Sequence, residues 1–376
     1  MKITGAVLEE IGLPGPYATS RPLKIQDLEL ADPQQGEVLV RLAAAGVCHS
    51  DLSIINGDRP RPMPMLLGHE GSGIVEKLGE GVTDLAVGDH VVFVFMPSCG
   101  HCPMCQSGRP SLCEPGSVAN GRGEMLGGGF RISRNGERVH TMTGVSSFAT
   151  YATASRRSVV KIEKDVPLDI AAMMGCAVLT GTGAVFNTGA VKPGGTAAIV
   201  GLGGVGLSAL LGAVAMGVEK IVAVDTVPAK LNIAKEMGAT HTYNAADPDL
   251  VDKIKEDTRG GVETALEFAG SVRALEAAFS YTRRGGTTIS AAFANHKAKL
   301  SISPVQMVAE ERTLKGSYLG TSIPQRDIPR FIGLYQRGKL PVEKLLTHKL
   351  RLDEVNLAFD RLHSGEAIRQ IITFET

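Results

Sequence analysis

The sequence predicts an α/β protein that combines a small β-barrel-like domain with a doubly wound parallel sheet. Three observations predict this. Short Val-rich runs bounded by Gly and Asp fill the first third of the 376 residues. Strand-like and helix-like segments then alternate from about residue 176 to 293, and the final segment 368–376 is strand-like again. Such alternation is typical of parallel strands joined by crossover helices, whereas short strands between turns are typical of a barrel.

The individual elements follow from hydrophobic periodicity and from turn residues. In the first region, we expect three strands, over 36–47, 71–79 and 88–96. In the second region, a strand over 196–203 enters a run of glycines and a helix over 206–217 follows it. The remaining elements expected there are strands over 220–225, 263–270 and 285–293, with helices over 227–239 and 273–282.

Composition and charge exclude several classes of protein. The 39 acidic and 39 basic residues give zero net charge, and no Lys/Arg run suggests a nucleic-acid partner. The N-terminus, MKITGAVLEE, lacks the long apolar region of a secretory signal. Residues 193–218 carry no charge and are long enough to span a bilayer, but their clustered glycines favour a buried strand, a turn and a buried helix. We therefore expect a cytoplasmic protein without a membrane segment.

Four of the six cysteines lie close together in the segment 94–116, with the spacing C-x2-C-x2-C-x7-C. Four thiolates complete the tetrahedral shell of Zn²⁺ and leave no position open for a substrate. The expected role is structural: the metal holds a protruding loop that has little core of its own. The alternative is a free-thiol or redox cluster. The four residues are Cys99, Cys102, Cys105 and Cys113.

The two other cysteines, Cys48 and Cys176, form a second candidate metal group with His69. Two cysteines and one histidine are a known ligand set of catalytic Zn²⁺, which keeps its fourth position open. The three residues are far apart in the sequence. Each by itself is also explained as a core cysteine or a turn histidine, so both interpretations stay open at this point.

The stretch IVGLGGVG has the pattern G-x-G-x-x-G at Gly201, Gly203 and Gly206. It follows an apolar strand and opens a helix, and the next strand ends in Asp225. These features are typical of dinucleotide binding, in which the helix N-terminus receives the pyrophosphate and the acid receives the ribose hydroxyls. Asp225 would repel a 2′-phosphate, which favours NAD over NADP, and Lys230 is near enough to help hold the ribose. The alternative is a glycine turn without a ligand, with Asp225 capping the next helix.

With these residues in place, the sequence resembles the zinc-dependent medium-chain dehydrogenase/reductase family, specifically its alcohol dehydrogenases. Six motifs carry the resemblance in family order over nearly the whole chain: AAAGVCHSD, GHEGSGIV, the four-Cys lobe, GCAVLTGTGAV, IVGLGGVGLS and GEAIRQIITF. The resemblance implies a GroES-like catalytic domain interrupted by a Rossmann domain. The implied boundaries are 1–177 for the GroES-like part, including the zinc lobe at about 94–116, then 178–318 for the NAD-binding domain and 319–376 for the return to the catalytic domain.

The resemblance also implies roles for individual residues. Cys48, His69 and Cys176 would bind the catalytic zinc, and the four-Cys lobe would bind the structural zinc. Glu70 would lie behind the catalytic metal and Asp51 would orient His69. The residues expected at the cofactor are Gly201, Gly203, Gly204, Val205, Gly206, Asp225, Lys230, His49, Thr180 and Arg369.

The implied activity is reversible hydride transfer from a primary alcohol to NAD, which yields the aldehyde. Ser50 is placed to take the hydroxyl proton. Many relatives carry a histidine three residues later as the outer end of the proton relay, where this chain has Ser53. His49 is the near substitute, and we expect it to bind cofactor phosphate first and to relay protons second.

The substrate pocket is expected to be mostly apolar, with Phe95, Val118, Met142 and Thr143 as its lining and Leu319 near its mouth. That lining favours medium-chain or aromatic primary alcohols. One alternative is a substrate of the S-hydroxymethylglutathione type, for which only Arg59 and Arg122 offer a positive charge. Another is a non-catalytic relative that binds zinc and NAD. The resemblance also implies a homodimer through a sheet edge around 287–303, with a tetramer as the alternative.

Overall fold

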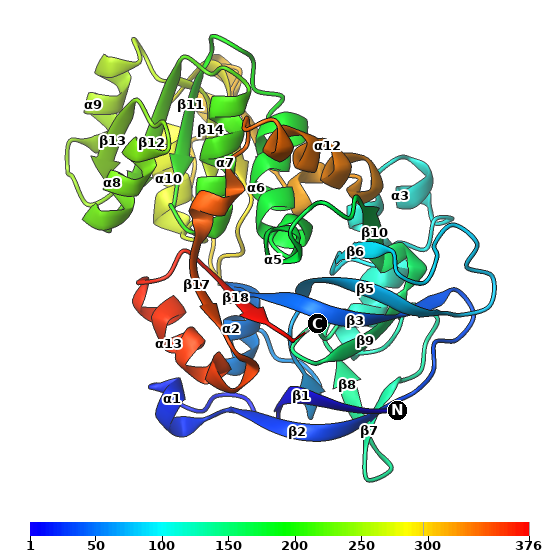
Figure 1. Ribbon diagram of the computed structural model, residues 1–376. Helices are drawn as coiled ribbons and strands as arrows, with labels where there is room; N and C mark the ends of the chain where they lie inside the picture. The colour runs from blue at the N-terminus through cyan, green and yellow to red at the C-terminus, as the bar shows by residue number, and fades with distance from the viewer. Residues whose placement is uncertain (296, 376) are drawn as a thin grey trace. The chain divides into compact units, whose positions relative to one another are not determined.

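The computed structural model describes residues 1–295 and 297–375, and the chain divides into two compact units (Figure 1). The first unit comprises Met1–Cys176, Ile323–Ile332 and Leu346–Thr376; the second comprises Ala177–Ser322 and Gly333–Leu345. The sequence places all of 319–376 in the first domain, whereas residues 319–322 and Gly333–Leu345 group with the second unit. The reason is packing, because Leu340, Val342 and Leu345 are fully buried and the turn at 342–345 contacts the first long helix of that unit.

Part of the first unit is a closed barrel of five strands, connected in the order β1-β2-β7-β8-β4. Side chains alternate along β1: Ile3 and Val7 join the core of the barrel, while Ala6 and Leu8 join a second core. The predicted strands do not include any of these five. The barrel strands are β1 (Lys2–Leu8), β2 (Leu23–Leu30), β4 (Met65–Leu66), β7 (Ile132–Arg134) and β8 (Glu137–Thr141).

The three predicted strands of the first region lie instead in a seven-stranded sheet, in the order β10-β6-β5-β3-β18-β17, with β9 paired to β3. The C-terminal strand β18 lies between β3 and β17, so the end of the chain completes a sheet that its first half begins. The strands are β3 (Glu37–Val47), β5 (Glu70–Leu78), β6 (His90–Phe93), β9 (Tyr151–Ser155), β10 (Val159–Ile162), β17 (Leu346–Leu350) and β18 (Arg369–Thr373).

The helices of the first unit are short. Those of the cysteine-rich lobe are α3 (Pro103–Gln106), η1 (Pro110–Leu112) and α4 (Glu114–Arg122), and α3 buries none of its residues. A lobe with so little apolar core needs another source of stability. The other helices are α1 (Tyr17–Ser20), α2 (His49–Ile55), η2 (Arg156–Ser158), α5 (Leu168–Ala171), η7 (Leu352–Glu354) and α13 (Val355–Ser364).

The second unit is built on a six-stranded sheet in the order β13-β12-β11-β14-β15-β16, and all five neighbouring pairs are parallel. The strand order reverses direction between β11 and β14, as in doubly wound folds. The predicted strands of this region correspond to members of this sheet. The strands are β11 (Thr196–Val200), β12 (Lys220–Asp225), β13 (His241–Asn244), β14 (Val262–Glu267), β15 (Thr282–Ser290) and β16 (Thr313–Gly316).

Helices cover both faces of this sheet. Leu250 of α9 and Ala278 of α10 share a core with Ala198 and Val200 of β11. The alternate residue Ile199 points the other way, toward Gly206 of α7. The helices are α6 (Leu179–Gly183), α7 (Gly204–Ala215), α8 (Pro228–Glu236), α9 (Leu250–Asp257), α10 (Val272–Ser280), α11 (Pro304–Ala309), η5 (Leu319–Thr321) and η6 (Val342–Leu345), with a π-helical turn η4 (Ala184–Thr188). The π-helical turn η3 (Met174–Val178) and the helix α12 (Pro324–Gln336) have residues in both units.

The edge of the parallel sheet differs from the sequence expectation. Thr287–Ser290 lie in β15, which pairs with β14 on one side and with β16 on the other. Residues 291–295 and 297–303 form no strand, and His296 lies outside the described residues. The edge strand is therefore β16, and placing the edge at 287–303 was wrong. The short strand β16 is hard to identify from sequence because only Leu314 in TLKG is strongly apolar.

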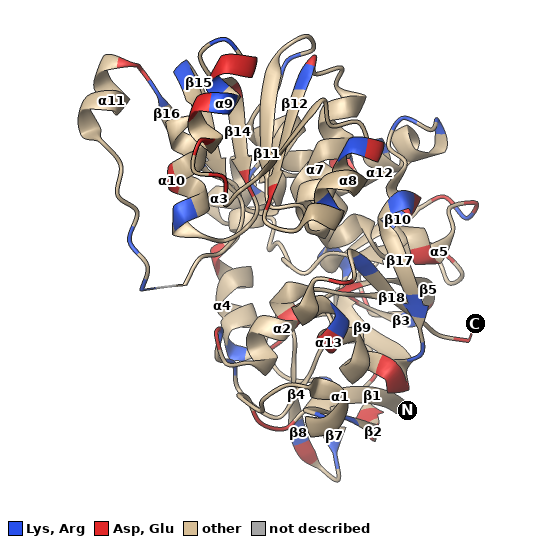
Figure 2. Cartoon of the chain, turned by 90° about the vertical axis from the view of Figure 1, so that its left-hand side faces the viewer, with Lys and Arg blue, Asp and Glu red and all other residues tan. Residues whose placement is uncertain are grey.

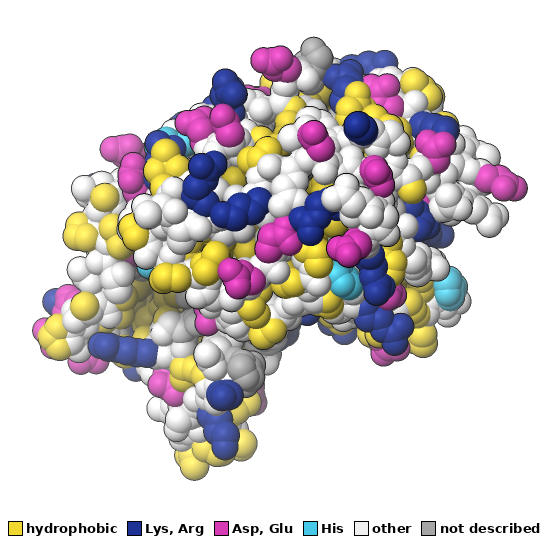
Figure 3. Space-filling model, turned by 90° about the horizontal axis from the view of Figure 1, so that it is seen from below, with side chains coloured by type: hydrophobic (Ala, Val, Ile, Leu, Met, Phe, Trp, Pro, Cys, Tyr) yellow, Lys and Arg dark blue, Asp and Glu magenta, His cyan; other side chains and the backbone are white. Residues whose placement is uncertain are grey.

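The net charge is zero, and charged residues of both signs are interspersed along the chain in Figure 2 and on the face drawn in Figure 3. The uncharged segment 193–218 forms strand β11, the glycine turn and helix α7, as predicted. Within the described residues, one helical stretch, Leu168–Thr188, is long and apolar enough to cross a membrane, and 89% of its most apolar window is buried inside the protein. A buried core helix has these properties.

Candidate metal centres and dinucleotide site

The sulfur atoms of the four-cysteine lobe (Cys99, Cys102, Cys105 and Cys113) lie within 4.8 Å of one another. Backbone amides point at them: Cys99 N–H donates to Cys113 Sγ at 3.2 Å and Cys102 N–H donates to Cys99 Sγ at 3.2 Å. Amide donors stabilise thiolates, and four thiolates this close repel one another unless a cation lies between them. The donor set therefore fits a zinc ion with four sulfur ligands and no open position.

The protonation of the lobe supports the same fit. The amide of Cys105 lowers the pKa of Cys102 to about 6, whereas burial raises the pKa of Cys105 to about 12. Without a metal, neighbouring sulfurs in the cluster hold their protons very differently. A divalent cation removes this difference in acidity, because metal binding deprotonates all of the cysteine ligands.

The second group brings together residues that are distant in the sequence. Ligand atoms of Cys48, His69, Glu70 and Cys176 all lie within 4.8 Å of one another, and all four residues are buried. Cys48 is the N-cap of α2, and His69 and Glu70 stand at the start of β5. Cys176 lies in the π-helical turn η3, and wide turns of this kind often occur at functional sites.

Asp51 holds this second group in place. Its Oδ1 lies 3.2 Å from His69 Nδ1 and accepts the Gly68 amide at 3.2 Å, while its Oδ2 accepts the Cys48 amide at 3.2 Å. With its proton on Nδ1, His69 presents a bare Nε2 to a metal. His69 Nε2 lies 3.6 Å from Cys176 Sγ. Two sulfurs and one nitrogen thus converge, with Asp51 already bonded to His69 and to the Cys48 amide, which fits a zinc ion with an open position.

Glu70 and Arg369 form a fully buried ion pair next to this group. The Glu70 oxygen Oε1 has no hydrogen-bond partner and lies 3.8 Å from His69 Nε2. Burial raises the pKa of Glu70 to about 7, although the Arg369 charge acts in the opposite direction. An unpaired carboxylate oxygen at this place fits a residue that exchanges onto a nearby metal. Arg369, expected at the cofactor, is committed to Glu70 through one nitrogen while its Nε has no partner.

The residues of the expected proton relay lie on α2. Ser50 is half-buried in the first turn, two residues after Cys48. Ser53 donates its hydroxyl to the His49 carbonyl at 2.8 Å, a contact within the same helix. This bond commits the only proton of the Ser53 side chain, so Ser53 does not replace a histidine at the outer end of a relay. His49 is exposed at the N-terminus of the helix.

The glycine motif makes a tight turn between β11 and α7. Gly201 has φ +86°, which favours glycine. A Cβ at Gly206 would lie 1.8 Å from the Gly201 carbonyl oxygen, so α7 packs this closely on the turn only with glycine there. At Gly203, the N-cap of α7, a Cβ would meet nothing within 4 Å. Space above Gly203, together with the free amides of Gly204 and Val205, fits an approaching pyrophosphate.

Asp225 ends β12, and its carboxylate is tied to the backbone at two points. Its Oδ2 accepts the Leu202 amide at 2.7 Å and its Oδ1 accepts the Val227 amide at 2.9 Å. Asp225 is thus fixed beside the glycine turn, where the sequence expects the ribose. Lys230 is half-buried in α8, and Thr180 is buried in α6.

The expected pocket residues lie in different surroundings. The ring of Phe95 packs edge-on against the ring of His69, with centroids 5.3 Å apart. Met142 is buried, and Thr143 has φ +52° and a buried hydroxyl without a partner. Val118 on α4 is 52% exposed. In the second unit, Leu319 is buried.

Sequence reasoning missed Glu267, the last residue of β14. Its Oε1 accepts the Gly270 amide at 2.6 Å, and its Oε2 accepts the Ser290 hydroxyl at 3.2 Å. It therefore orders the loop at the carboxyl end of a central strand, where ligands bind in this type of sheet. The signal was an acid at the end of an apolar strand, in ALEFAG, the same kind of signal that identified Asp225.

Comparisons with known proteins identify the family. The alcohol dehydrogenase GroES-like domain matches residues 34–164, and the zinc-binding dehydrogenase domain matches residues 204–337. The S-(hydroxymethyl)glutathione dehydrogenase of Synechocystis sp. is 37% identical over 378 aligned residues, with 100% of both chains covered. The chain belongs to the zinc-dependent medium-chain dehydrogenase family. It is an oxidoreductase with a GroES-like domain and a Rossmann-type domain, which confirms the predicted family and fold class.

Two further relatives show the range of this family. The NDMA-dependent alcohol dehydrogenase of Amycolatopsis methanolica is 39% identical, with 99% of each chain covered. The crystal structure of benzyl alcohol dehydrogenase from Acinetobacter calcoaceticus is 35% identical, with 100% of both chains covered and a TM-score of 0.93. The relatives thus share one scaffold but differ in their named substrates.

Proposed function

We propose that the protein is an NAD-dependent zinc alcohol dehydrogenase that reversibly oxidises a primary medium-chain or aromatic alcohol to its aldehyde. The observation that carries this proposal is the buried group of Cys48, His69 and Cys176, with Asp51 already fixing two of its members. Zinc held by these donors supplies a Lewis acid that polarises the alcohol oxygen. NAD held by the glycine turn supplies the hydride acceptor.

Residues of α2 handle the proton in this proposal. The Ser50 hydroxyl, two residues after the ligand Cys48, would accept the proton that leaves the alcohol while its own proton passes to the ribose of the bound nicotinamide. Ser53 takes no part, since its proton is donated to the His49 carbonyl. His49, exposed at the N-terminus of α2, binds a cofactor phosphate and passes the proton onward only in second place. An imidazole at the N-terminus of a helix is suited to contact an anion, because the helix dipole is positive at that end.

Asp225 sets the cofactor preference. Its carboxylate is held by two backbone amides and cannot swing away from the ribose position. A second negative group at that position, such as a 2′-phosphate, would be repelled. We therefore propose NAD rather than NADP as the cofactor, with Lys230 and Thr180 as further contacts.

The preference for an apolar alcohol rests on Phe95 and Met142. Phe95 packs on the ring of His69, so an apolar surface borders the candidate metal group. Benzyl alcohol dehydrogenase is among the related structures of nearly the same fold. A second candidate substrate is S-(hydroxymethyl)glutathione, favoured by the relative from Synechocystis sp., which also aligns over the whole chain. That substrate needs cationic residues at the pocket mouth, for which Arg59 and Arg122 are the available candidates.

A substrate panel tests the proposal. NADH or NADPH formation is measured with benzyl alcohol, hexanol, ethanol and S-(hydroxymethyl)glutathione, each with NAD and with NADP. We expect the highest kcat/KM with benzyl alcohol or hexanol and NAD, and loss of activity after chelation with recovery on adding Zn²⁺. A clear preference for S-(hydroxymethyl)glutathione would contradict the substrate class, and turnover that survives complete zinc removal would contradict the mechanism.

We also propose that the protein is cytoplasmic and dimeric. None of the six cysteines forms a disulfide, as expected in a reducing compartment. The edge strand β16 is the candidate for pairing between two sheets, since it has one unpaired side. Light scattering combined with gel filtration measures the oligomeric state directly.

A further inference from the structure

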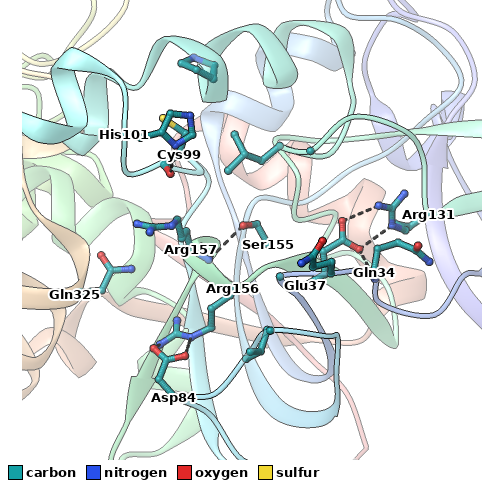
Figure 4. Close-up of a pocket in the computed structure, with 17 residues that line it drawn as sticks. Gln34, Glu37, Asp84, Cys99, His101, Arg131, Ser155, Arg156, Arg157 and Gln325 are labelled. Carbon is teal, nitrogen blue, oxygen red and sulfur yellow. Dashed lines mark hydrogen bonds and ion pairs between the residues drawn. The ribbon is translucent and has the colours of Figure 1, made fainter.

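A cleft of about 1020 Å³ lies in the first unit, beside the four-cysteine lobe (Figure 4). Three arginines line it. Arg131 forms a two-pronged ion pair with Glu37, at 2.8 Å for both bonds, and Arg156 pairs with Asp84 at 2.7 Å for both bonds. Across the described residues, the third arginine, Arg157, forms no salt bridge, although its charge helps to lower the pKa of Asp84 after the larger effect of Arg156. Its guanidinium lies instead beside Gly100 of the four-cysteine lobe.

The Arg157 guanidinium packs closely against Gly100. A Cβ built on Gly100 would lie 2.4 Å from Arg157 Nη1, 2.6 Å from Cζ and 2.7 Å from Nη2. These three distances place the point above the plane of the guanidinium, close to its Nη1–Nη2 edge. Figure 4 shows Arg157 on the Cys99 side of the cleft, away from the two ion pairs. Gly100, with φ +83°, is therefore where the lobe rests on this side chain.

Gly100 connects this contact to the metal ligands. It lies between Cys99 and the exposed His101, whose Nδ1 is 3.0 Å from the Cys99 carbonyl oxygen. Burial raises the pKa of the Cys105 thiol, and the Gly100 amide, which faces that sulfur, acts in the opposite direction. A side chain that fixes the Gly100 peptide therefore also fixes the direction of the Gly100 N–H toward the sulfur of Cys105.

Arg157 is itself anchored outside the lobe. It lies in η2, between strands β9 and β10 of the seven-stranded sheet, and its amide donates to the Ser155 hydroxyl at 3.3 Å. Arg157, which is held between two strands of the sheet, thus supports a lobe that buries little of its own surface.

We propose that Arg157 is a positioning residue for the four-cysteine zinc site. Its guanidinium face supports the Gly100 peptide and keeps the Gly100 amide directed at Cys105 Sγ. Its positive charge also lies beside four thiolates, whose charge exceeds that of one zinc ion. Groups outside the ligand shell that orient ligands typically change metal affinity by about 10- to 100-fold. Because Arg157 is exposed, we expect the lower end of that range, about tenfold.

Zinc release from the intact protein tests the proposal. A chromogenic chelator records release of both zinc ions over time, and the phase absent from a Cys176→Ser variant identifies the trio site. In Arg157→Gln we expect the phase from the four-cysteine lobe to be about tenfold faster, with the other phase unchanged. The free energy of urea unfolding measured on the zinc-free proteins should be the same for both, which separates this effect from a general loss of stability.

Two matched controls lose a positive charge nearby. Arg156→Gln changes the neighbouring residue of η2, and Arg109→Gln removes an exposed cation of the lobe itself. Neither should speed release from the lobe more than about twofold, because the loss of an exposed charge changes interaction energies only slightly. Equal acceleration in these controls, or an unchanged rate in Arg157→Gln, would overturn the proposal.

Arg157→Lys covers the case in which Arg157→Gln does not fold. Lysine keeps the charge and the aliphatic stem but cannot present a flat face. We expect zinc release from the lobe to be faster than in the unmodified protein but slower than in Arg157→Gln, where the increase is about tenfold. A rate in Arg157→Lys equal to that of the unmodified protein would show that the flat contact with Gly100 has no role.

Discussion

One carboxylate, Asp51, organises most of the candidate catalytic metal group. It accepts amides from Gly68 and Cys48 and holds the Nδ1 side of His69, with each distance at 3.2 Å. These contacts decide which His69 nitrogen faces the metal. At the scale of single residues, the ligands depend on a neighbour that is not a ligand.

Replacing Asp51 tests this dependence. Asp51→Asn keeps the size of the side chain but removes its charge and one acceptor. We expect zinc affinity at the Cys48–His69–Cys176 group to fall about 10- to 100-fold, with the four-cysteine lobe unaffected. Metal content measured against a series of chelator concentrations gives the answer. Asp58→Asn, a change in the loop that follows α2, serves as the control and should leave both sites filled.

The buried carboxyl group of Glu267 should make the free energy of unfolding depend on pH. Burial raises the pKa of Glu267 in the folded protein above its ordinary value of 4.5, against the effect of the amides of Gly270 and Ser271. The folded state then binds the proton more tightly than the unfolded state. The stabilisation that proton binding at Glu267 contributes is therefore complete below pH 4.5. It is lost as the pH rises through the pKa of Glu267 in the folded state.

The comparison for this prediction is Glu267→Gln, which keeps an oxygen acceptor for the Gly270 amide. Free energies of unfolding in urea, measured from pH 4 to pH 8, should fall more steeply with pH in the unmodified protein than in the variant. Parallel pH profiles for the two proteins would contradict the prediction.

At the scale of elements, the turn between β11 and α7 shows why its glycines are not equivalent. Gly206 permits contact between helix and turn, since a Cβ there would lie 1.8 Å from the Gly201 carbonyl oxygen. Gly203 has φ −78° and open space around its Cα, so the fold alone does not require glycine. Glycine at Gly203 is explained by a ligand that approaches its backbone.

Alanine substitutions separate the two roles. Gly206→Ala should lower the stability of the protein by about 1–3 kcal/mol because α7 must shift. Gly203→Ala should change stability by less than about 0.5 kcal/mol, as expected for a residue with no close neighbour, yet weaken NAD binding at least tenfold. Urea unfolding and NAD titration by fluorescence measure the two effects. Normal NAD affinity in Gly203→Ala would mean that the pyrophosphate lies elsewhere.

At the scale of the whole molecule, the two cysteine groups serve different purposes. The lobe concentrates four donors in a segment with almost no core, which leaves a metal there no open position. The second group lies in the buried interior of the first unit and has three such donors plus the unpaired oxygen of Glu70. The densest cluster of reactive residues is thus the poorer candidate for the reaction centre.

Removing one ligand from each group distinguishes them. Cys102→Ser should lower the melting temperature by several degrees and reduce assembly before it affects the chemistry of the remaining folded protein, because metal binding is part of folding there. Cys176→Ser should abolish turnover while most of the fold survives. Calorimetry and steady-state rates per folded molecule measure the two outcomes. Full loss of turnover in folded Cys102→Ser would contradict the division of roles.

Much of the architecture could be predicted from local patterns. The strands and helices around IVGLGGVG were identified because apolar runs, glycines and a terminal acid follow one another within a short segment. The family was predicted from six motifs and is confirmed. The barrel strands β1, β2, β4, β7 and β8 were missed, since several are short or carry charged residues along one face.

The sequence by itself determined the family, the two-part fold class, and the donor types of both metal groups, because these depend on residue identity and spacing. Only the tertiary structure decided that Cys48, His69 and Cys176 converge, that Arg369 is committed to Glu70, and that Ser53 is bonded within its helix. It also showed that the sheet ends at β16 and that Arg157 supports Gly100. The physical reason is that these facts are contacts between distant segments, or choices among hydrogen-bond partners, which emerge only when the chain packs.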